Sequence, residues 1–251
     1  MVRESLSVYK DGEIETMNYP LMLMMVLSLL PGSLTSRVFV GFATDLKKGK
    51  NLYAEEHEAS YENGRPTRLT TTYRDDVKNI IATRIVDFSQ HAFTPSFRLE
   101  NYRTGYVEGA ERVEGGLRLY VRRAINEPME ERVISVSQPT VVDAGFNNFV
   151  QTYWDSLMTG RKLYLNFAVP SRLEYYGFRL YKEGETTVGG RRAVVVICDI
   201  DSFVLRFLVK PIVLTYDIET TRLLSYEGIS NISDEKGDNY FVKIAFSPLG
   251  P

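Results

Sequence analysis

One amphipathic segment, residues 144–159, stands in a chain whose other patterns are almost all those of β-strands. Its apolar residues recur at helical spacing and fall on one stripe of a helix. They are Phe146, Phe149, Val150, Tyr153, Trp154, Leu157 and Met158. A helix that carries the chain's only tryptophan and is set in a β protein must lie on a sheet face. It packs either as ordinary core or as a plug in a concave β surface, and the sequence leaves both interpretations open.

The residues at the two ends of this segment agree with a helix. Asp143 is placed to accept hydrogen bonds from free N–H groups of the first turn, so we expect it to be the N-cap. Gly160 is placed to end the helix in a left-handed conformation, with Arg161 and Lys162 beside the negative end of the helix dipole.

Strand patterns recur at hairpin spacing on both sides of the helix. Asn63-Gly64 is a strong hairpin signal. The segments predicted as strands are 52–61, 66–73, 79–88, 97–104, 106–113, 117–123, 131–137, 161–169, 173–183, 191–200, 212–217, 223–231 and 240–246, whereas 203–209 fits either a short helix or a strand. These segments predict a mainly β fold, in which a single curled antiparallel sheet forms a half-barrel and the helix packs in or over its concave face.

Composition and charge exclude few functions. The net charge is −2 and no basic face is visible, so the sequence gives no sign of a nucleic-acid partner. Cys198 is the only cysteine and lies in a valine-rich strand, where a small buried side chain explains it better than a nucleophile. The two histidines, His57 and His91, lie on other segments without a recognisable partner motif.

Two groups of acidic residues are candidate sites. In the stretch Glu55-Glu56-His57-Glu58, strand geometry puts Glu55 and His57 on one face and the other two residues on the opposite face. No further ligand group converges there, so we interpret the stretch as a solvated strand face rather than a metal site. Asp199 and Asp201 also share a face, and the end of a strand entering a turn explains them most simply.

The N-terminal region has the pattern of an export signal. Residues 21–30 read LMLMMVLSLL, which is too short to span a bilayer and fits the apolar core of a secretory signal. Met17 is a plausible start, and small residues offer cleavage sites after Ser36 or Ala43. We therefore expect residues 1–43 to be an upstream extension and a signal peptide (about 17–43), and residues 44–251 to form one periplasmic β domain. A buried N-terminal helix of a cytosolic protein is the alternative.

Several short runs together resemble a group of uncharacterised, exported proteobacterial proteins. The runs are Gly145-Phe146-Asn147-Asn148-Phe149, Trp154-Asp155, Val169-Pro170-Ser171-Arg172-Leu173, Phe178-Arg179, Pro211-Ile212, Tyr216-Asp217 and Tyr226-Glu227-Gly228-Ile229-Ser230-Asn231. That group implies no activity. The layout also resembles, more distantly, the periplasmic lipoprotein carriers of the LolA/LolB type. This likeness implies an open half-barrel in which helices plug an apolar hollow that holds acyl chains.

The resulting first hypothesis is a periplasmic binding protein for a lipid or acylated ligand, without catalysis, cofactor or metal. The residues expected to line the hollow are Phe149, Tyr153, Trp154, Leu157, Phe167 and Tyr175. The second hypothesis is a structural or interaction protein of the cell envelope, with a filled core and no ligand, for which an envelope protein is the candidate partner. An enzyme would need a cleft that joins Cys198 or Asp199 to a histidine. An exposed apolar patch, instead of an internal hollow, would favour the second hypothesis.

Overall fold

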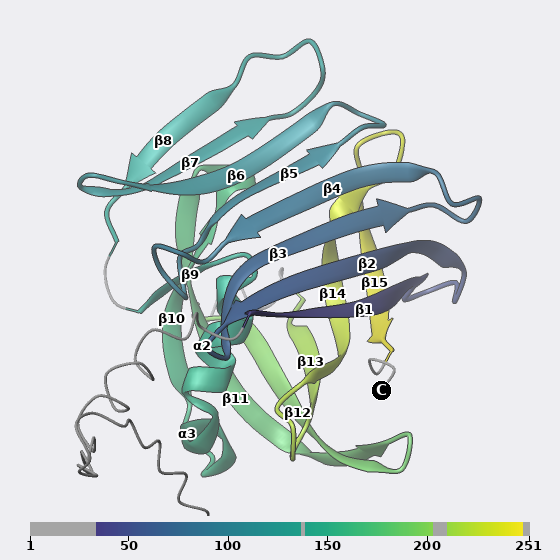
Figure 1. Cartoon of the computed structure of the whole chain (residues 1–251), viewed down its shortest axis with the longest axis vertical. Helices are drawn as coiled ribbons and strands as arrows, with labels where there is room; N and C mark the ends of the chain where they lie inside the picture. The colour runs from purple at the N-terminus through teal and green to yellow at the C-terminus, as the bar shows by residue number, and fades with distance from the viewer. Residues whose placement is uncertain (1–33, 137–138, 203–209, 248–251) are drawn as a thin grey trace, which may run out of the picture. The chain divides into compact units, whose positions relative to one another are not determined.

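The structure is a computed structural model that describes residues 34–136, 139–202 and 210–247. The described part is built mostly of strands, with two short α-helices and one short 3-10 helix among the elements (Figure 1). In chain order these are β1 (Leu34–Asp45), β2 (Asn51–Glu62), β3 (Arg65–Arg74), β4 (Ile80–Asp87), β5 (Ser96–Asn101), β6 (Tyr106–Val113), β7 (Gly116–Arg122), β8 (Glu130–Ile134), β9 (Thr140–Val142), α2 (Gly145–Thr152), α3 (Trp154–Met158), β10 (Leu163–Val169), η2 (Pro170–Arg172), β11 (Glu174–Val188), β12 (Arg191–Ile200), β13 (Ile212–Asp217), β14 (Leu223–Ser233) and β15 (Asn239–Phe246).

All the described strands belong to one 15-stranded sheet. Its order is β8-β7-β6-β5-β4-β3-β2-β1-β15-β14-β13-β12-β11-β10-β9, so two runs of consecutive strands meet where β1 pairs with β15. Every pairing is antiparallel except that of β9 with β10. In Figure 1 the β1–β8 run crosses in front of the β10–β15 run. The predicted mainly β fold with one curled, open sheet is confirmed, and β8 and β9 are its unpaired edges among the described strands.

The predicted hairpins are confirmed as well. Asn63 and Gly64 have φ of +52° and +76°, which are the left-handed conformations that a tight hairpin turn between β2 and β3 requires. The β2–β3 ladder runs from Glu62 opposite Arg65 to Ala54 opposite Arg74. Turn chemistry in the sequence therefore sets the register of this pair.

The N-terminal boundary of the domain differs from the prediction. β1 spans Leu34–Asp45 and pairs with β2 along its length, and its residues from Gly41 to Asp45 also pair with β15. This strand lies in the middle of the described sheet, so the sheet includes residues 34–43, which the sequence analysis placed in the export region. The predicted signal core, residues 21–30, lies outside the described residues, as does the ambiguous segment 203–209.

The amphipathic segment forms two helices instead of one. α2 ends at Thr152 and α3 begins at Trp154, because Tyr153 leaves helical geometry with φ −102° and ψ 21°. Asp143 is not the N-cap: its φ is +45°, Ala144 occupies the cap position, and no side-chain cap bond forms. Gly160 is left-handed as predicted, with φ +84°.

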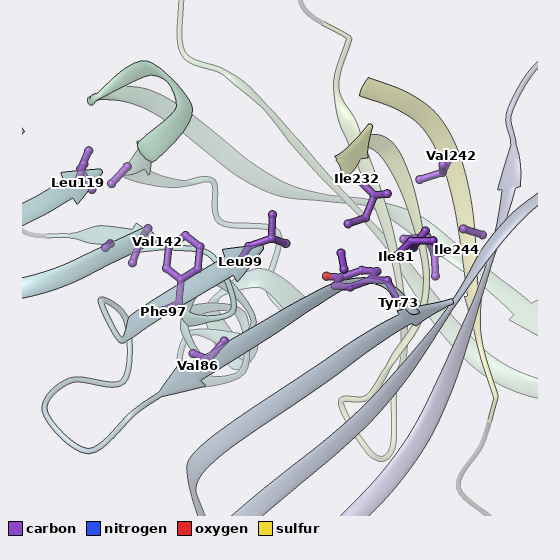
Figure 2. Close-up of a cluster of buried hydrophobic side chains, with 14 of the residues drawn as sticks. Tyr73, Ile81, Val86, Phe97, Leu99, Leu119, Val142, Ile232, Val242 and Ile244 are labelled. Atoms are coloured by element: carbon purple, nitrogen blue, oxygen red, sulfur yellow. The ribbon is translucent and has the colours of Figure 1, made fainter. Parts of the chain in front are cut away.

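The buried apolar side chains form two clusters. The first joins the inner face of β1–β8 to β14 and β15, and Figure 2 shows Tyr73 and Ile81 beside Ile232 and Ile244. The second joins α2 and α3 to β9–β13, with Phe149, Val150 and Leu157 against side chains such as Leu180 and Leu214. The helices therefore cover one face of the second run of strands.

Candidate functional site

The six residues predicted to line a hollow have different environments. Phe149 and Leu157 are 1% and 0% exposed, so they are packed core. Trp154 is partly buried against the same cluster, with its ring centroid 5.8 Å from that of Tyr216. Tyr153 and Tyr175 are exposed.

The structure brings five of these residues to the helix-covered side of the sheet and separates the sixth. Phe167 packs between Phe146 and Phe178, with ring centroids 5.8 and 5.9 Å away. It lies opposite Tyr176 in the β10–β11 ladder, so Tyr175, one residue earlier, points to the other face. Tyr175 therefore cannot share a wall with Phe167 without rearrangement.

Two of the hollows on the described surface are shallow, at about 230 Å³ each, and neither has a predicted ligand residue in its wall. One is lined by Arg98, Glu111, Arg118, Tyr120, Met129 and Glu131. The other is lined by Pro139, Tyr164, Leu165, Asn166, Gly177, Phe178 and Asp201. Their walls mix charged and polar side chains with apolar ones and are open to solvent, which does not suit a buried acyl chain.

A buried polar network lies on the inner face of the first run of strands. Glu55 and His57 share a face of β2 as predicted, but that face points inward, and the residues are only 5% and 4% exposed. The interpretation of a solvated face is therefore wrong for these two residues. His57 Nε2 lies 3.0 Å from Glu55 Oε2, and its Nδ1 lies 3.0 Å from Thr71 Oγ1.

The network continues from β3 through β4 to the loop before α2. Arg84 Nη2 donates to Thr71 Oγ1 at 3.3 Å, and its Nη1 donates to Asp143 Oδ2 at 3.1 Å. Arg84 Nε is buried and has no partner. The chain of contacts therefore links strands β2, β3 and β4 to the segment that positions α2.

The donors at two of these contacts follow from the chemistry of the groups. A guanidinium can only donate, so the Thr71 oxygen accepts from Arg84. A carboxylate can only accept, so His57 Nε2 carries the hydrogen of its contact with Glu55. The Phe39 ring stacks on the imidazole with centroids 4.4 Å apart and planes 12° apart, which fixes the ring orientation.

The chemistry available to the network is limited by access. Thr71 is 0% exposed, so its hydroxyl has no route to a substrate in this conformation. Cys198 is also 0% exposed, as its burial in a valine-rich strand predicted, and desolvation raises the pKa of its thiol. Within the residues that the structure describes, no group of three or more His, Cys, Asp or Glu side chains is placed to hold a metal ion.

Asp199 is not one of a carboxylate pair. It is 9% exposed and accepts two hydrogen bonds from Arg179, from Nε at 2.5 Å and from Nη2 at 2.8 Å. This side-by-side pairing occupies both carboxylate oxygens. The residue that follows the strand, Asp201, is exposed and donates its backbone N–H to Gly177 O at 2.8 Å, which agrees with the interpretation as a strand end.

The comparisons with known proteins bear on the fold. No family model matches the chain, and no curated protein matches it. A solved structure that it resembles is described as a β-barrel-like protein of Domain of Unknown Function DUF1849 from Brucella abortus. The TM-score is 0.51, with 7% sequence identity, and the match covers 84% of this chain and 94% of that chain.

At this identity the likeness shows the fold alone, so the comparisons support a β-barrel-like architecture. The resemblance to the LolA/LolB carriers stays a prediction. Among the described helices, none has both the length and the apolar character needed to cross a membrane.

Proposed function

We propose that this chain is a non-catalytic protein of the cell envelope that acts through its outer surface, the second of the two hypotheses drawn from the sequence. The observation that carries the proposal is the packing of the helical stripe. Phe149 and Leu157, which would have to face an acyl ligand, lie within the second core cluster at 1% and 0% exposure. A filled interior leaves the outer face as the surface available for binding.

The outer face supports the proposal because it carries exposed apolar side chains near the centre of the sheet. On β1, Phe42 is 56% exposed while the next residue, Ala43, is 1% exposed, so Phe42 points away from the core. Phe241 on β15 and Ile229 on β14 lie opposite each other in the ladder and are also exposed. Leu46 donates its backbone N–H to Phe241 O, which brings a further exposed apolar residue beside them. Grouped exposed apolar residues are typical of interaction surfaces.

The rival proposal, binding of a lipid or acylated ligand, uses the same fold and needs a different state of it. To admit an acyl chain, α2 and α3 would have to leave the sheet and expose Phe149, Leu157 and their partners. Each buried acyl CH₂ contributes about 0.8 kcal/mol, so several would be needed to offset the exposure of one large core side chain. The export prediction is common to both proposals.

Site-specific photo-crosslinking in intact cells tests the proposed surface. A photo-reactive residue in place of Phe42 should yield adducts with an envelope component. The same residue in place of Asp87, an exposed position on the outer face of β4, is the matched control and should yield none. Equal adduct yields from the two positions, or no adducts from Phe42 in a variant that unfolds like the wild type, would contradict the proposal.

A further inference from the structure

A glycine inside a regular strand marks one of the shallow hollows described above. Gly177 lies on β11 directly opposite Asn166 of β10, and the ladder between these two strands has no register shift. Its φ is outside the left-handed range, so the backbone does not require glycine. An added Cβ would meet only the Cβ of Asp201, at 3.9 Å. At Gly41 and Gly109, by contrast, an added Cβ would come within 2.8 Å of a neighbouring atom.

Neither the backbone nor the packing of the described residues therefore explains why position 177 has no side chain. Glycine in the interior of a strand weakens it and often marks a place that another molecule approaches closely. Gly177 lines the hollow of about 230 Å³ that also has Tyr164, Asn166 and Asp201 in its wall. We call it the Gly177 hollow.

The wall of the Gly177 hollow carries an aromatic ring and a carboxylate. Tyr164 alternates along β10 with Leu165, which packs with the helices, so the Tyr164 ring lies on the opposite face and is 55% exposed. Gly177 lies on this face too, because it pairs with Asn166, two residues after Tyr164. Asp201 donates its backbone N–H to Gly177 O at 2.8 Å, which brings its exposed side chain to the same hollow. A ring face and a carboxylate both attract cations.

The charges at the Gly177 hollow leave one carboxylate for a ligand. Asp199 and Asp201 both raise the pKa of the Arg179 guanidinium, and the hydrogen-bonded Asp199 raises it most. Asp199 accepts two bonds from this guanidinium, at 2.5 and 2.8 Å, so the charges of these two groups cancel. Within the described ranges Asp201 takes part in no ion pair. The three groups together therefore carry one negative charge.

We propose that the Gly177 hollow binds a guanidinium group, with the Tyr164 ring stacked on its plane and the Asp201 carboxylate accepting its N–H bonds. A guanidinium fits this pair of groups better than an ammonium because it is planar and more weakly hydrated. It can also pair with a carboxylate through two parallel bonds while it stacks on an aromatic ring.

The size of the hollow favours an arginine side chain of a partner protein as the source of the guanidinium. Pockets that enclose whole small molecules begin at about 300 Å³. The Gly177 hollow is smaller and open to solvent, so it suits a side chain that projects into it. The site lies on β10 and β11 and at the end of β12, whereas the Phe42 surface lies on β1, β14 and β15, so its test does not depend on the function proposed above.

Saturation-transfer NMR of arginine blocked at both ends, added to the full chain, tests the site. The dissociation constant should be on the order of 1 mM, because an exposed ion pair and one ring contact each contribute little. Blocked citrulline has nearly the same shape and no charge, and it should bind at least about tenfold more weakly. Blocked lysine should also bind more weakly than blocked arginine, because it lacks the planar group.

Three variants locate the binding. Gly177→Val should abolish it, because valine suits a strand, its Cβ meets no close neighbour and its side chain fills the hollow. Asp201→Asn should weaken binding about fivefold and Tyr164→Leu about threefold. Glu183→Gln removes an exposed carboxylate from the same strand outside the hollow, so it is the control and should bind like the wild type.

The wild-type chain alone can overturn the proposal, whatever the folding of the variants. Equal affinity for blocked arginine and blocked citrulline would do so, as would equal affinity for blocked arginine and blocked lysine. Unchanged arginine binding in a folded Gly177→Val variant would place the binding elsewhere and contradict the site. Free arginine that binds tenfold more tightly than the blocked form would show recognition of a free amino acid and overturn the assignment to a protein side chain.

Discussion

Arg84 Nη1 donates to Asp143 Oδ2 at 3.1 Å, and this bond ties β4 to the loop that begins α2. The two side chains are 14% and 9% exposed, so the ion pair is largely removed from water. Asp143 also accepts the Ala144 N–H and has φ +45°, a left-handed conformation. One carboxylate thus fixes both the direction of the chain into α2 and its attachment to the first run of strands.

Asp143→Asn should be strongly destabilising. Asparagine tolerates the left-handed conformation, so the substitution removes the charge and leaves the backbone unstrained. Arg84 would then be a buried cation without its partner, which costs about 3–5 kcal/mol of unfolding free energy. Urea unfolding measures this cost. Asp76→Asn, at an exposed turn position, is the control and should change stability by less than about 0.5 kcal/mol. Equal stability of the two variants would mean that the Arg84–Asp143 pair does not hold α2.

Cys198 should react slowly with thiol reagents in the native protein. Its side chain is 0% exposed and desolvation raises its pKa, so both access and thiolate content are low. Labelling followed by mass spectrometry should show a rate that rises steeply once urea unfolds the chain. Fast native labelling would show that β12 opens, and loss of an activity in Cys198→Ser would favour an enzyme.

Asp217 should make stability depend on acid pH. Its Oδ1 accepts from the backbone N–H groups of Glu219 and Thr220, at 3.0 and 2.8 Å, and these bonds lower its pKa from the ordinary value of 3.8, the one from Thr220 most. The bonds therefore stabilise the fold above about pH 4, and this contribution is lost as the pH falls below that value.

Asp217→Ala should cost about 2 kcal/mol at pH 7. The difference from wild type should shrink between pH 5 and pH 2, as measured by urea unfolding. Glu219→Ala, which removes an exposed neighbouring carboxylate, should show neither effect, and a difference that persists at pH 2 would contradict the assignment.

Export should leave β1 intact. The sequence analysis offered cleavage sites after Ser36 and after Ala43. The first would remove three of the twelve residues of β1 and the second would remove ten, from a strand that pairs with β2 and β15. We now expect N-terminal sequencing of envelope protein to find a start at or before Leu34. A start after Ala43 on folded protein would show that the sheet does not need β1. An intact Met1 or Met17 on protein from the cytosol would rule export out.

Local patterns predicted most of the fold because hairpin turns and alternation are local properties. Asn63-Gly64 and the strand from Arg191 to Ile200 are examples, and both are where the sequence placed them. β1 was missed because apolar residues occupy both of its faces, as Phe39 and Ala43 alternate with Val38 and Phe42, so no alternation is visible. The break between α2 and α3 at Tyr153 was not predicted because no glycine or proline, the usual helix-breaking residues, lies there.

The polar network was harder to predict because its members are brought together by tertiary structure. Strand parity correctly put Glu55 and His57 on one face, but local sequence does not say which face is inside. The apolar residues Tyr53 and Ala59 share that face and are buried in the structure, but Leu52 and Ala54 put apolar residues on the opposite face too, so the pattern does not choose between the faces. Arg84 shares a face of β4 with the apolar residues Ala82 and Val86. A charged residue on an apolar face is a sign of a buried polar contact. The partner of Arg84, Asp143, is 59 residues away, and no local pattern connects the two.

The fluorescence of Trp154 tests the central claim, a filled interior, most directly. It is the chain's only tryptophan, and its ring packs against Tyr216 beneath α3, so emission reports on this part of the helical layer. Titration with a long-chain fatty acid and with an acylated peptide should leave the emission unchanged. Phe149→Ala, at 1% exposure, should cost the roughly 3–5 kcal/mol of a packed aromatic. A saturable shift in emission, together with a much smaller cost for Phe149→Ala, would contradict the account and restore the carrier hypothesis.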